Sequence, residues 1–413
     1  MTATLTRSFD YEVLDGSGKR RKGSMDASNE AAAAATLRAQ GVTPLSIIEA
    51  GKGLSRDLNL PTLRKRVTLK DLSIFARQFA TMTSSGLTLL RSLAVLEEQT
   101  EKLPLKNAIR DIRHDVEGGM SLSASMGRHD RIFPRLMVAM IRAGETGGFL
   151  DQALDRIATN FEKDANLRAK IKSAMTYPVI VICFSVLMIS GVLIFIVPVF
   201  EKMFKQLGGK LPLPTQVLVT LSHDMVWIAP LSIIALVLCT TSFKRKLRDD
   251  YAWRLAFDKF KLRLPVFGKL FIKIAISRFS RNFGTLLSVG VPVMQALDVV
   301  GGTTGNAVIG EAMKDVKASV RDGQPMSTPL VKHAIFPAMV TQMIQVGEET
   351  GQISAMLDKI SDFYDHEVEV ATESLTAAIE PVMVVVMGAL VGTMVICLYM
   401  PMFTIYQHIQ GAS

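Results

Sequence analysis

The feature that most restricts the fold of this chain is the segment at residues 173–200, which contains no Asp, Glu, Lys or Arg. It reads SAMTYPVIVICFSVLMISGVLIFIVPVF, and about 20 apolar residues in a helix cross the hydrocarbon core of a bilayer. Each Val, Ile, Leu or Phe favours insertion by roughly 0.3–0.6 kcal/mol, which outweighs the few Ser, Gly and Pro residues. The chain is therefore predicted to be an integral membrane protein.

Two further segments, at residues 217–243 and 381–405, have the same character. The first contains MVWIAPLSIIALVLCTTSF, and the second contains PVMVVVMGALVGTMVICLYMPMF. His223 and Asp224 lie near one end of the segment at 217–243. They could form a proton relay within the membrane or lie in the outer headgroup layer, where hydration is available, and we favour the headgroup layer. Three transmembrane helices are predicted.

The Lys and Arg residues beside these segments predict the direction of the chain. Three cations lie within residues 168–172, before the first span, and four lie within residues 244–248, after the second. The segment between the two spans has three lysines, and no Lys or Arg follows Lys359. Because cytoplasmic flanks are enriched in Lys and Arg, we expect the N-terminus in the cytoplasm and the C-terminus outside.

Composition agrees with a chain that is only partly embedded in lipid. Apolar residues make up 49% and charged residues 21%, so a membrane part and a soluble part are expected together. The net charge of +9 would suit nucleic acid or cytoplasmic flanks of a membrane protein. Only 7% of residues are aromatic, and no groove-reading motif is visible, so we expect no nucleic-acid partner.

An internal repeat organises the rest of the chain. At an offset of 204 residues, one half matches the other, and after one deletion the offset becomes 203. The matched pairs are Phe75 and Phe279, Arg77 and Arg281, Gly86 and Gly290, Gly119 and Gly323, Phe133 and Phe336, Glu145 and Glu348, Pro178 and Pro381, and Pro198 and Pro401. The repeat therefore includes the membrane spans.

Each repeat is predicted to be a helical bundle whose last helix continues into the membrane. The apolar stripe Leu72, Phe75 and Phe79 recurs as Ile276, Phe279 and Phe283 at helical spacing. The fold class is therefore mainly α, with a small N-terminal α/β unit. The predicted segments are a β-β-α-β unit at 1–50 with Ser28 as the helix N-cap, a basic linker at 51–67, helical domain 1 at 68–172, a span at 173–200, a short periplasmic loop at 201–216, a span at 217–243, helical domain 2 at 271–378 and a span at 381–405.

Motifs that carry catalytic chemistry are missing from the sequence. There is no GxxxxGK[ST] phosphate loop, no zincin HExxH, no complete dinucleotide fingerprint and no GxSxG elbow. The three cysteines lie in three different apolar segments, which excludes a zinc site at finger spacing. We expect no enzymatic activity, no catalytic residue, no cofactor and no metal.

The candidate functional residues are those that occur at equivalent positions in both repeats. The turns GETGG and GEETG place Gly144, Glu145 and Gly148 opposite Gly347, Glu348 and Gly351. The glutamates could meet a cation or a partner's Arg, but we favour a structural role, with glycine allowing positive φ in a tight turn and Glu near a helix start favouring the helix dipole. Arg77 and Arg281 could pair with a buried acid or extend along the bundle surface. Pro178 and Pro381 are expected to set a bend.

The segments FARQFATMTSSGLTLLRSL, IFPRLMVAMIRAGETGG, SAMTYPVIV, IVPVFEKMF and LPLPT, with their second copies, resemble the PilC/GspF family. The resemblance covers nearly the whole chain. It implies two cytoplasmic six-helix-bundle domains, three transmembrane helices and a multi-pass protein of the bacterial inner membrane. It also implies an assembly platform of a type IV pilus or a type II secretion system, and the sequence leaves that choice open.

The partners implied by the resemblance are a cytoplasmic hexameric assembly ATPase, pilin or pseudopilin subunits, other inner-membrane assembly proteins, and further copies of the chain in a homo-oligomer. The platform would couple the ATPase to the extraction of pilins from the membrane and to fibre assembly. The alternative is a membrane transporter for a small substrate or ion, built from the repeats, although intramembrane charge is nearly lacking.

Overall fold

The computed structural model describes residues 7–14, 20–39, 41–49, 67–206, 213–265 and 267–410. It forms two compact units, Met1–Lys65 and Arg66–Ser413. Most of the predicted basic linker at 51–67 lies outside the described residues.

The N-terminal unit is a three-stranded antiparallel sheet with one helix. The strand order is β2-β1-β3, and the residues buried in its core include Phe9 and Ala33. The prediction of a small α/β unit is confirmed, but the predicted cap at Ser28 is wrong, because Asn29 Oδ1 accepts the hydrogen bond from Ala32 N at 2.8 Å. Its elements are β1 (Arg7–Leu14), β2 (Arg20–Ala27), α1 (Glu30–Ala39) and β3 (Thr43–Glu49).

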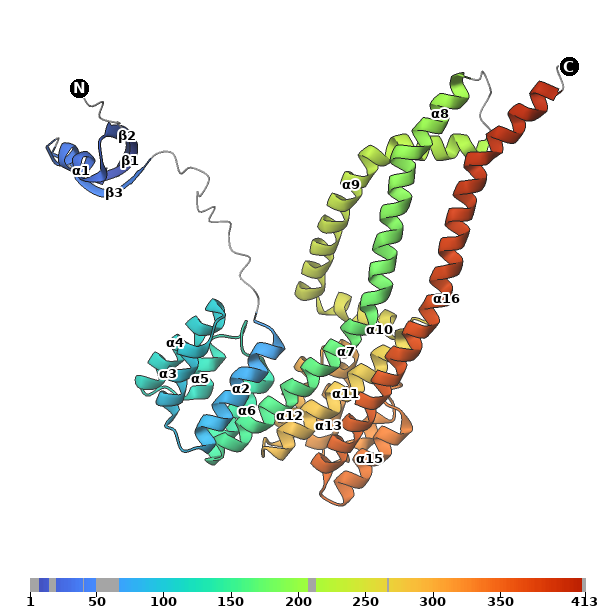
Figure 1. Cartoon of the computed structure of the whole chain (residues 1–413). Helices are drawn as coiled ribbons and strands as arrows, with labels where there is room; N and C mark the ends of the chain where they lie inside the picture. The colour runs from blue at the N-terminus through green and yellow to red at the C-terminus, as the bar shows by residue number, and fades with distance from the viewer. Residues whose placement is uncertain are drawn as a thin grey trace. The chain divides into compact units, whose positions relative to one another are not determined.

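The larger unit contains two bundles with the same helix order (Figure 1). Bundle 1 comprises α2 (Leu69–Ser84), α3 (Leu89–Gln99), α4 (Leu103–Glu117), α5 (Leu122–Gly127), α6 (Arg135–Gly147) and the first half of α7 (Leu150–Gly191). Bundle 2 comprises α11 (Phe267–Ser288), α12 (Val293–Thr303), α13 (Ala307–Arg321), α14 (Ser327–Leu330), α15 (Ala338–Glu349) and the first half of α16 (Ile353–Gln410). The predicted helical repeat is present as two bundles.

The repeated aromatic residues explain why both halves fold in the same way. Phe75 packs against Phe133 with ring centroids 5.9 Å apart, and the matching pair, Phe279 and Phe336, lies at 5.2 Å. Burial of each such ring contributes roughly 1.5–3 kcal/mol. The buried residues of both bundles belong to one continuous hydrophobic core. The bundles are therefore packed as a single body.

Glycine ends the first helix of each bundle. Gly86 has φ of 82° and Gly290 has φ of 77°, a left-handed conformation that glycine adopts without steric cost. Each follows the last residue of its helix by two positions, so the chain reverses at the same place in both repeats.

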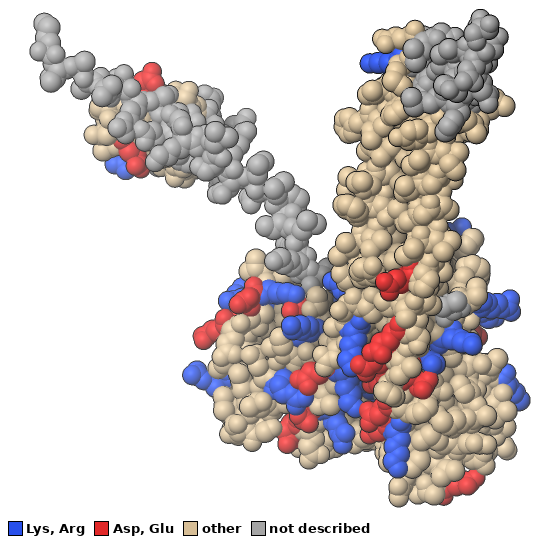
Figure 2. Space-filling view, turned by 45° about the vertical axis from the view of Figure 1, so that its right-hand side comes forward, with Lys and Arg blue, Asp and Glu red and all other residues tan. Residues whose placement is uncertain are grey.

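Helices α7, α9 (Leu213–Asp249) and α16 extend together from the bundles (Figure 1). The part that extends shows few charged side chains among the described residues (Figure 2). Two helical stretches, Leu150–Met203 and Ile353–Met400, are long and apolar enough to cross a membrane. Large apolar side chains point outward there, such as Phe184 at 65% exposed and Leu187 at 73%. Such surfaces suit lipid and not water.

The predicted span at 217–243 falls within α9, but α9 is not one of the two stretches found among the described residues. The side chains of residues 226–230, in its middle, lie outside the described part. The span at 217–243 therefore stays a prediction, and so does the total of three transmembrane helices.

One local prediction needs correction, and one helix was not predicted. The periplasmic loop predicted at 201–216 is helical at both ends, because α8 (Val197–Gln206) extends into its start and α9 begins at Leu213. A π-helical turn, Val192–Ile196, precedes α8, and Pro198 explains it, since proline has no N–H to donate to the preceding turn. In addition, helix α10 (Tyr251–Arg263) occupies a segment for which no element was predicted.

Candidate functional site

The first feature that occurs in both repeats is an arginine that joins the first and last helices of each bundle. In bundle 1, Arg77 on α2 donates from Nε to Glu162 Oε1 on α7 at 2.9 Å and from Nη2 to Glu162 Oε2 at 2.8 Å. Arg77 also pairs with Asp155 and bonds Thr159 Oγ1 at 3.1 Å. The two parallel bonds to Glu162 are the geometry in which guanidinium binds carboxylate most strongly.

In bundle 2 the same connection is buried. Arg281 on α11 pairs with Asp365 on α16, and its side chain is only 4% exposed, against 39% for Arg77. Arg281 Nη2 also donates to Ser277 Oγ at 3.2 Å. Its Nε and Nη1 atoms have no hydrogen-bond partner among the described residues. Both arginines pair with an acid, but the predicted buried acid is not found, since the side chains of Glu162 and Asp365 are 40% and 25% exposed.

The electrostatics of the bundle 1 pair follow from these contacts. The hydrogen bond from Arg77 lowers the pKa of Glu162 below its ordinary value. The same bond raises the pKa of Arg77. Both groups are charged at neutral pH, so the pair fastens α7 to α2 as an ion pair.

The second feature is a glutamate that holds a helix start. Glu145 Oε1 and Oε2 accept hydrogen bonds from the backbone N–H groups of Leu122 at 2.6 Å and Ser123 at 3.1 Å, in the first turn of α5. Glu348 likewise accepts from Met326 N, at 2.9 and 3.0 Å, beside α14. These N–H groups have no partner within their own helix, so the carboxylate stabilises the helix start.

The prediction that Gly144 and Glu145 form a turn is wrong. Both lie in the last turn of α6, and the helix start that Glu145 faces belongs to α5 and not to the following helix. Glu348 lies in the same way near the end of α15.

The glycines of this motif have two different functions. A Cβ on Gly144 would lie 2.6 Å from Ala153 Cβ, and one on Gly347 would lie 3.0 Å from Ile353 Cα. These positions allow α6 and α15 to approach α7 and α16 closely. Gly148 and Gly351, with φ of 77° and 70°, instead reverse the chain at the helix end.

The two prolines lie inside the long helices. Pro178 is a buried residue of α7, and Pro381 is an exposed residue of α16. Both helices continue past them. The predicted bend at these positions stays a prediction.

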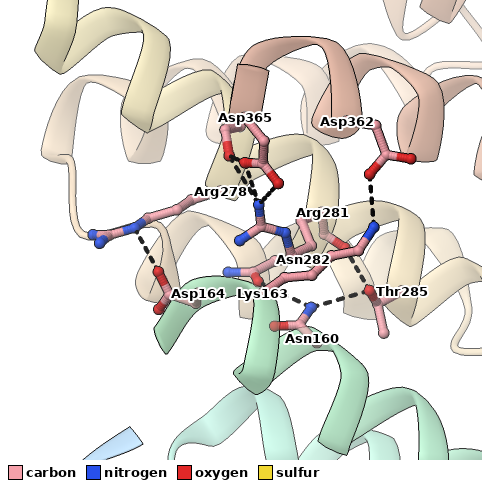
Figure 3. Close-up of polar contacts among 10 residues, drawn as sticks. Asn160, Lys163, Asp164, Arg278, Arg281, Asn282, Thr285, Asp362 and Asp365 are labelled. Atoms are coloured by element: carbon pink, nitrogen blue, oxygen red, sulfur yellow. Dashed lines mark hydrogen bonds and ion pairs between the residues drawn. The ribbon is translucent and has the colours of Figure 1, made fainter. Parts of the chain in front are cut away.

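A polar seam between the bundles was not predicted from the sequence (Figure 3). Asn160 on α7 donates from Nδ2 to Thr285 Oγ1 on α11 at 3.0 Å. Arg278 Nε lies 3.2 Å from Asp164 Oδ1. Burial lowers the pKa of Arg278, which the opposing charge of Asp164 partly offsets. We call these contacts, together with the two cross-bundle lysine pairs described next, the interbundle seam.

Two lysine pairs tie α7 directly to α16. Lys163 Nζ lies 2.6 Å from Asp362 Oδ1, and Lys170 Nζ lies 2.7 Å from Glu369 Oε1. Figure 3 shows Lys163 reaching across to Asp362. The two helices that extend toward the predicted membrane spans are therefore connected to each other below those spans.

Residues expected near the outer side of the membrane are separate from this region. His223 Nε2 on α9 lies 3.8 Å from Glu201 Oε2 on α8, and Asp224 is exposed. The headgroup position proposed for His223 and Asp224 stays a prediction. Among the residues that the structure describes, no group of three His, Cys, Asp or Glu side chains could hold a metal.

Taken together, the repeated contacts fix helix positions. Arg77 and Arg281 join the first and last helices of each bundle, Glu145 and Glu348 hold the short helices, and the interbundle seam joins the halves. The contacts therefore connect α7 and α16 to the other helices of their bundles and to each other.

Family models match most of the chain. The model for type II secretion system protein F matches twice, at residues 75–198 and 279–401, in agreement with the internal repeat. The model for the N-terminal domain of type II secretion system protein F matches residues 6–48, in the sheet-containing unit.

Curated relatives extend over almost the full length. The chain is 43% identical to the type IV pilus assembly protein PilC of Thermus thermophilus, over 96% of this chain and 98% of that protein. It is 40% identical to PilC of Myxococcus xanthus, over 98% and 96%. The type II secretion system protein F of Xanthomonas campestris is 31% identical, over 96% and 98%.

Proposed function

The chain belongs to the type II secretion system protein F family, and we propose that it is the inner-membrane platform on which a type IV pilus is assembled. Full-length similarity to proteins named for type IV pilus assembly supports this role. Identity to those two relatives, at 43% and 40%, exceeds the 31%, 29% and 30% to three type II secretion system F proteins. We therefore favour the pilus over the secretion system.

The observation that carries the mechanism is the continuity of α7 and α16. Each begins inside a bundle and runs without interruption into the apolar stretch expected to cross the membrane. A helix transmits an axial or rotational displacement along its length through its backbone hydrogen bonds, of which α7 lacks one at Pro178 and α16 lacks one at Pro381. Movement of the bundles would therefore reach the bilayer through these two helices.

In this proposal the bundles lie in the cytoplasm, where they dock on a hexameric assembly ATPase that supplies the work. Pilin subunits would be taken from the bilayer beside the membrane helices and added to the fibre. The N-terminus is cytoplasmic, three helices cross the membrane, and the C-terminus is outside. Further copies of the chain complete the platform as a homo-oligomer.

A clean deletion strain tests the function. Loss of surface fibres, restored by the intact chain, is expected, and the tagged chain should co-purify with the assembly ATPase and with pilin. Normal fibre production in the deletion strain would refute the proposal. Intact fibres together with loss of protein secretion would assign the chain to a type II secretion system instead.

The proposed transmission of movement from bundle 2 to the membrane is tested with Arg281→Met, which removes the buried connection between α11 and α16. If transmission depends on that connection, the variant should still co-purify with the ATPase while fibre assembly falls. The matched control is Arg135→Met, an exposed arginine for which no ion pair is found among the described contacts. If Arg281→Met gives wild-type fibre numbers at an equal protein level, transmission does not depend on the Arg281 connection.

A further inference from the structure

Helix α10 has two chemically different faces. One face packs on bundle 2, where Asp258, 3% exposed, accepts a hydrogen bond from Ala307 N at 2.8 Å, at the start of α13. Tyr251 Oη donates to Glu311 Oε1 at 2.5 Å from the same side. The helix is thus fastened to bundle 2 through buried and half-buried contacts.

The opposite face is aromatic and directed away from bundle 2. Trp253, Phe257 and Phe260 follow one another at helical spacing, and Trp253 is 47% and Phe260 59% exposed. Phe257 packs edge-on against Phe243 near the end of α9, with ring centroids 5.0 Å apart. This stripe therefore continues the exposed apolar surface of α9, which includes Leu236 at 65%.

Cations surround the stripe. Residues 244–263 contain eight Lys or Arg and three Asp. Lys246 Nζ lies 4.1 Å from the centre of the Trp253 ring, and the side chains of Arg245 and Arg248 are 82% and 80% exposed. Tryptophan beside Lys and Arg, at the end of an apolar helix, is the composition found at the bilayer surface.

We propose that α10 lies on the cytoplasmic surface of the bilayer and that its aromatic stripe and the preceding cations bind the headgroups of anionic phospholipids. Aromatic rings enter the boundary between headgroups and acyl chains, and the cations bind lipid phosphates. Because Asp258 and Tyr251 fasten α10 to bundle 2, this contact would set the orientation of bundle 2 relative to the membrane. The inference depends on the membrane insertion proposed above.

The test uses the full chain in lipid nanodiscs and its two tryptophans, Trp227 and Trp253. In Trp227→Phe, emission from Trp253 should shift to the blue and be quenched by lipids brominated near the headgroup. The shift should increase when phosphatidylglycerol replaces part of the phosphatidylcholine. The control is Trp227→Phe/Trp253→Phe/Val331→Trp, which places the probe at a residue of bundle 2 that is 69% exposed and should not be quenched.

The anionic preference is tested with Lys244→Gln/Arg245→Gln/Arg248→Gln, added to Trp227→Phe, which should lose the response to phosphatidylglycerol. A matched loss of three charges, at the exposed Arg131, Arg135 and Arg142 of bundle 1, should retain it. Quenching that is independent of phosphatidylglycerol in the Trp227→Phe protein would overturn the headgroup assignment.

Trp253→Phe, in which Trp227 remains, separates failure of the inference from failure of the proposed insertion. Quenching of Trp227 without quenching of Trp253 would overturn only the placement of α10. If neither tryptophan is quenched, both the placement and the membrane insertion of α9 are wrong.

Discussion

The guanidinium of Arg281 on α11 is paired with the carboxylate of Asp365 on α16, at the place where Arg77 is paired with Glu162 in bundle 1. The two connections are equivalent in the repeat but differ in their surroundings, because Arg281 is buried and Arg77 is partly exposed. The difference predicts unequal dependence of the two bundles on their arginines.

Arg281→Met is expected to destabilise the protein by about 3 kcal/mol, since it removes the buried guanidinium and leaves the partly buried carboxylate of Asp365 without its opposite charge. Arg77→Met should cost about 1 kcal/mol, because water can replace part of the lost contact. The double variant Arg281→Met/Asp365→Leu should recover most of the loss. Thermal unfolding of the purified chain in detergent measures this, and equal losses for Arg281→Met and Arg77→Met would contradict it.

The Arg77 pair also predicts a pH dependence. Because Arg77 lowers the pKa of Glu162 from its ordinary value of 4.5, the pair stabilises the folded state above that value. The contribution is lost as the pH falls through the lowered pKa of the folded state. The midpoint of thermal unfolding should therefore fall more steeply below pH 4.5 in the wild type than in Arg77→Met. The control Arg135→Met should keep the wild-type slope, and identical slopes for wild type and Arg77→Met would refute the assignment.

The helix-start glutamates predict matched effects in both bundles. Glu145→Ala and Glu348→Ala should each cost about 1 kcal/mol, the usual loss when an N-terminal cap is removed. Hydrogen exchange should increase at the backbone N–H groups of Leu122 and Ser123 in Glu145→Ala, and at Met326 in Glu348→Ala. An increase at both sites in either single variant would show that the contacts are not local.

Substitutions can distinguish the two structural roles of the glycines, close helix approach and chain reversal. Gly347→Ala should destabilise by about 1–3 kcal/mol, because its Cβ would lie 3.0 Å from Ile353 Cα. Gly351→Asn should be tolerated better, since no atom lies within 4 Å of its added Cβ and Asn adopts positive φ more readily than other residues with side chains. Unfolding midpoints compare the two variants, and a greater loss for Gly351→Asn would contradict the close approach of α15 to α16.

Much of the fold was predictable because the repeat involves residues with strong structural preferences. Phe75 and Phe279 mark the core stripe, and Gly86 and Gly290 mark the helix ends, so two bundles of equal order follow from the sequence. Helix α10 was missed because its aromatic face points away from the bundle while Asp258 points into it. That pattern opposes the usual direction of an amphipathic helix.

The site was predictable only in part. The repeat identified Arg77, Arg281, Glu145 and Glu348, but not their partners. Aligning residues around 162 with those around 365 would have placed Glu162 opposite Asp365, two acids at one repeat position. The interbundle seam has no such signal, because Asn160 and Thr285 come from different repeats and meet only after the bundles pack.

The position of the C-terminus is the most direct measurement, since the three proposed crossings would place it outside while both bundles remain in the cytoplasm. A reporter that fluoresces only in the cytosol, fused after Ser413, is expected to stay dark, and alkaline phosphatase at the same place is expected to be active. The same fluorescent reporter fused before Met1 should glow. Fluorescence from the fusion after Ser413 would contradict the three-span arrangement and the transmission of force through α16.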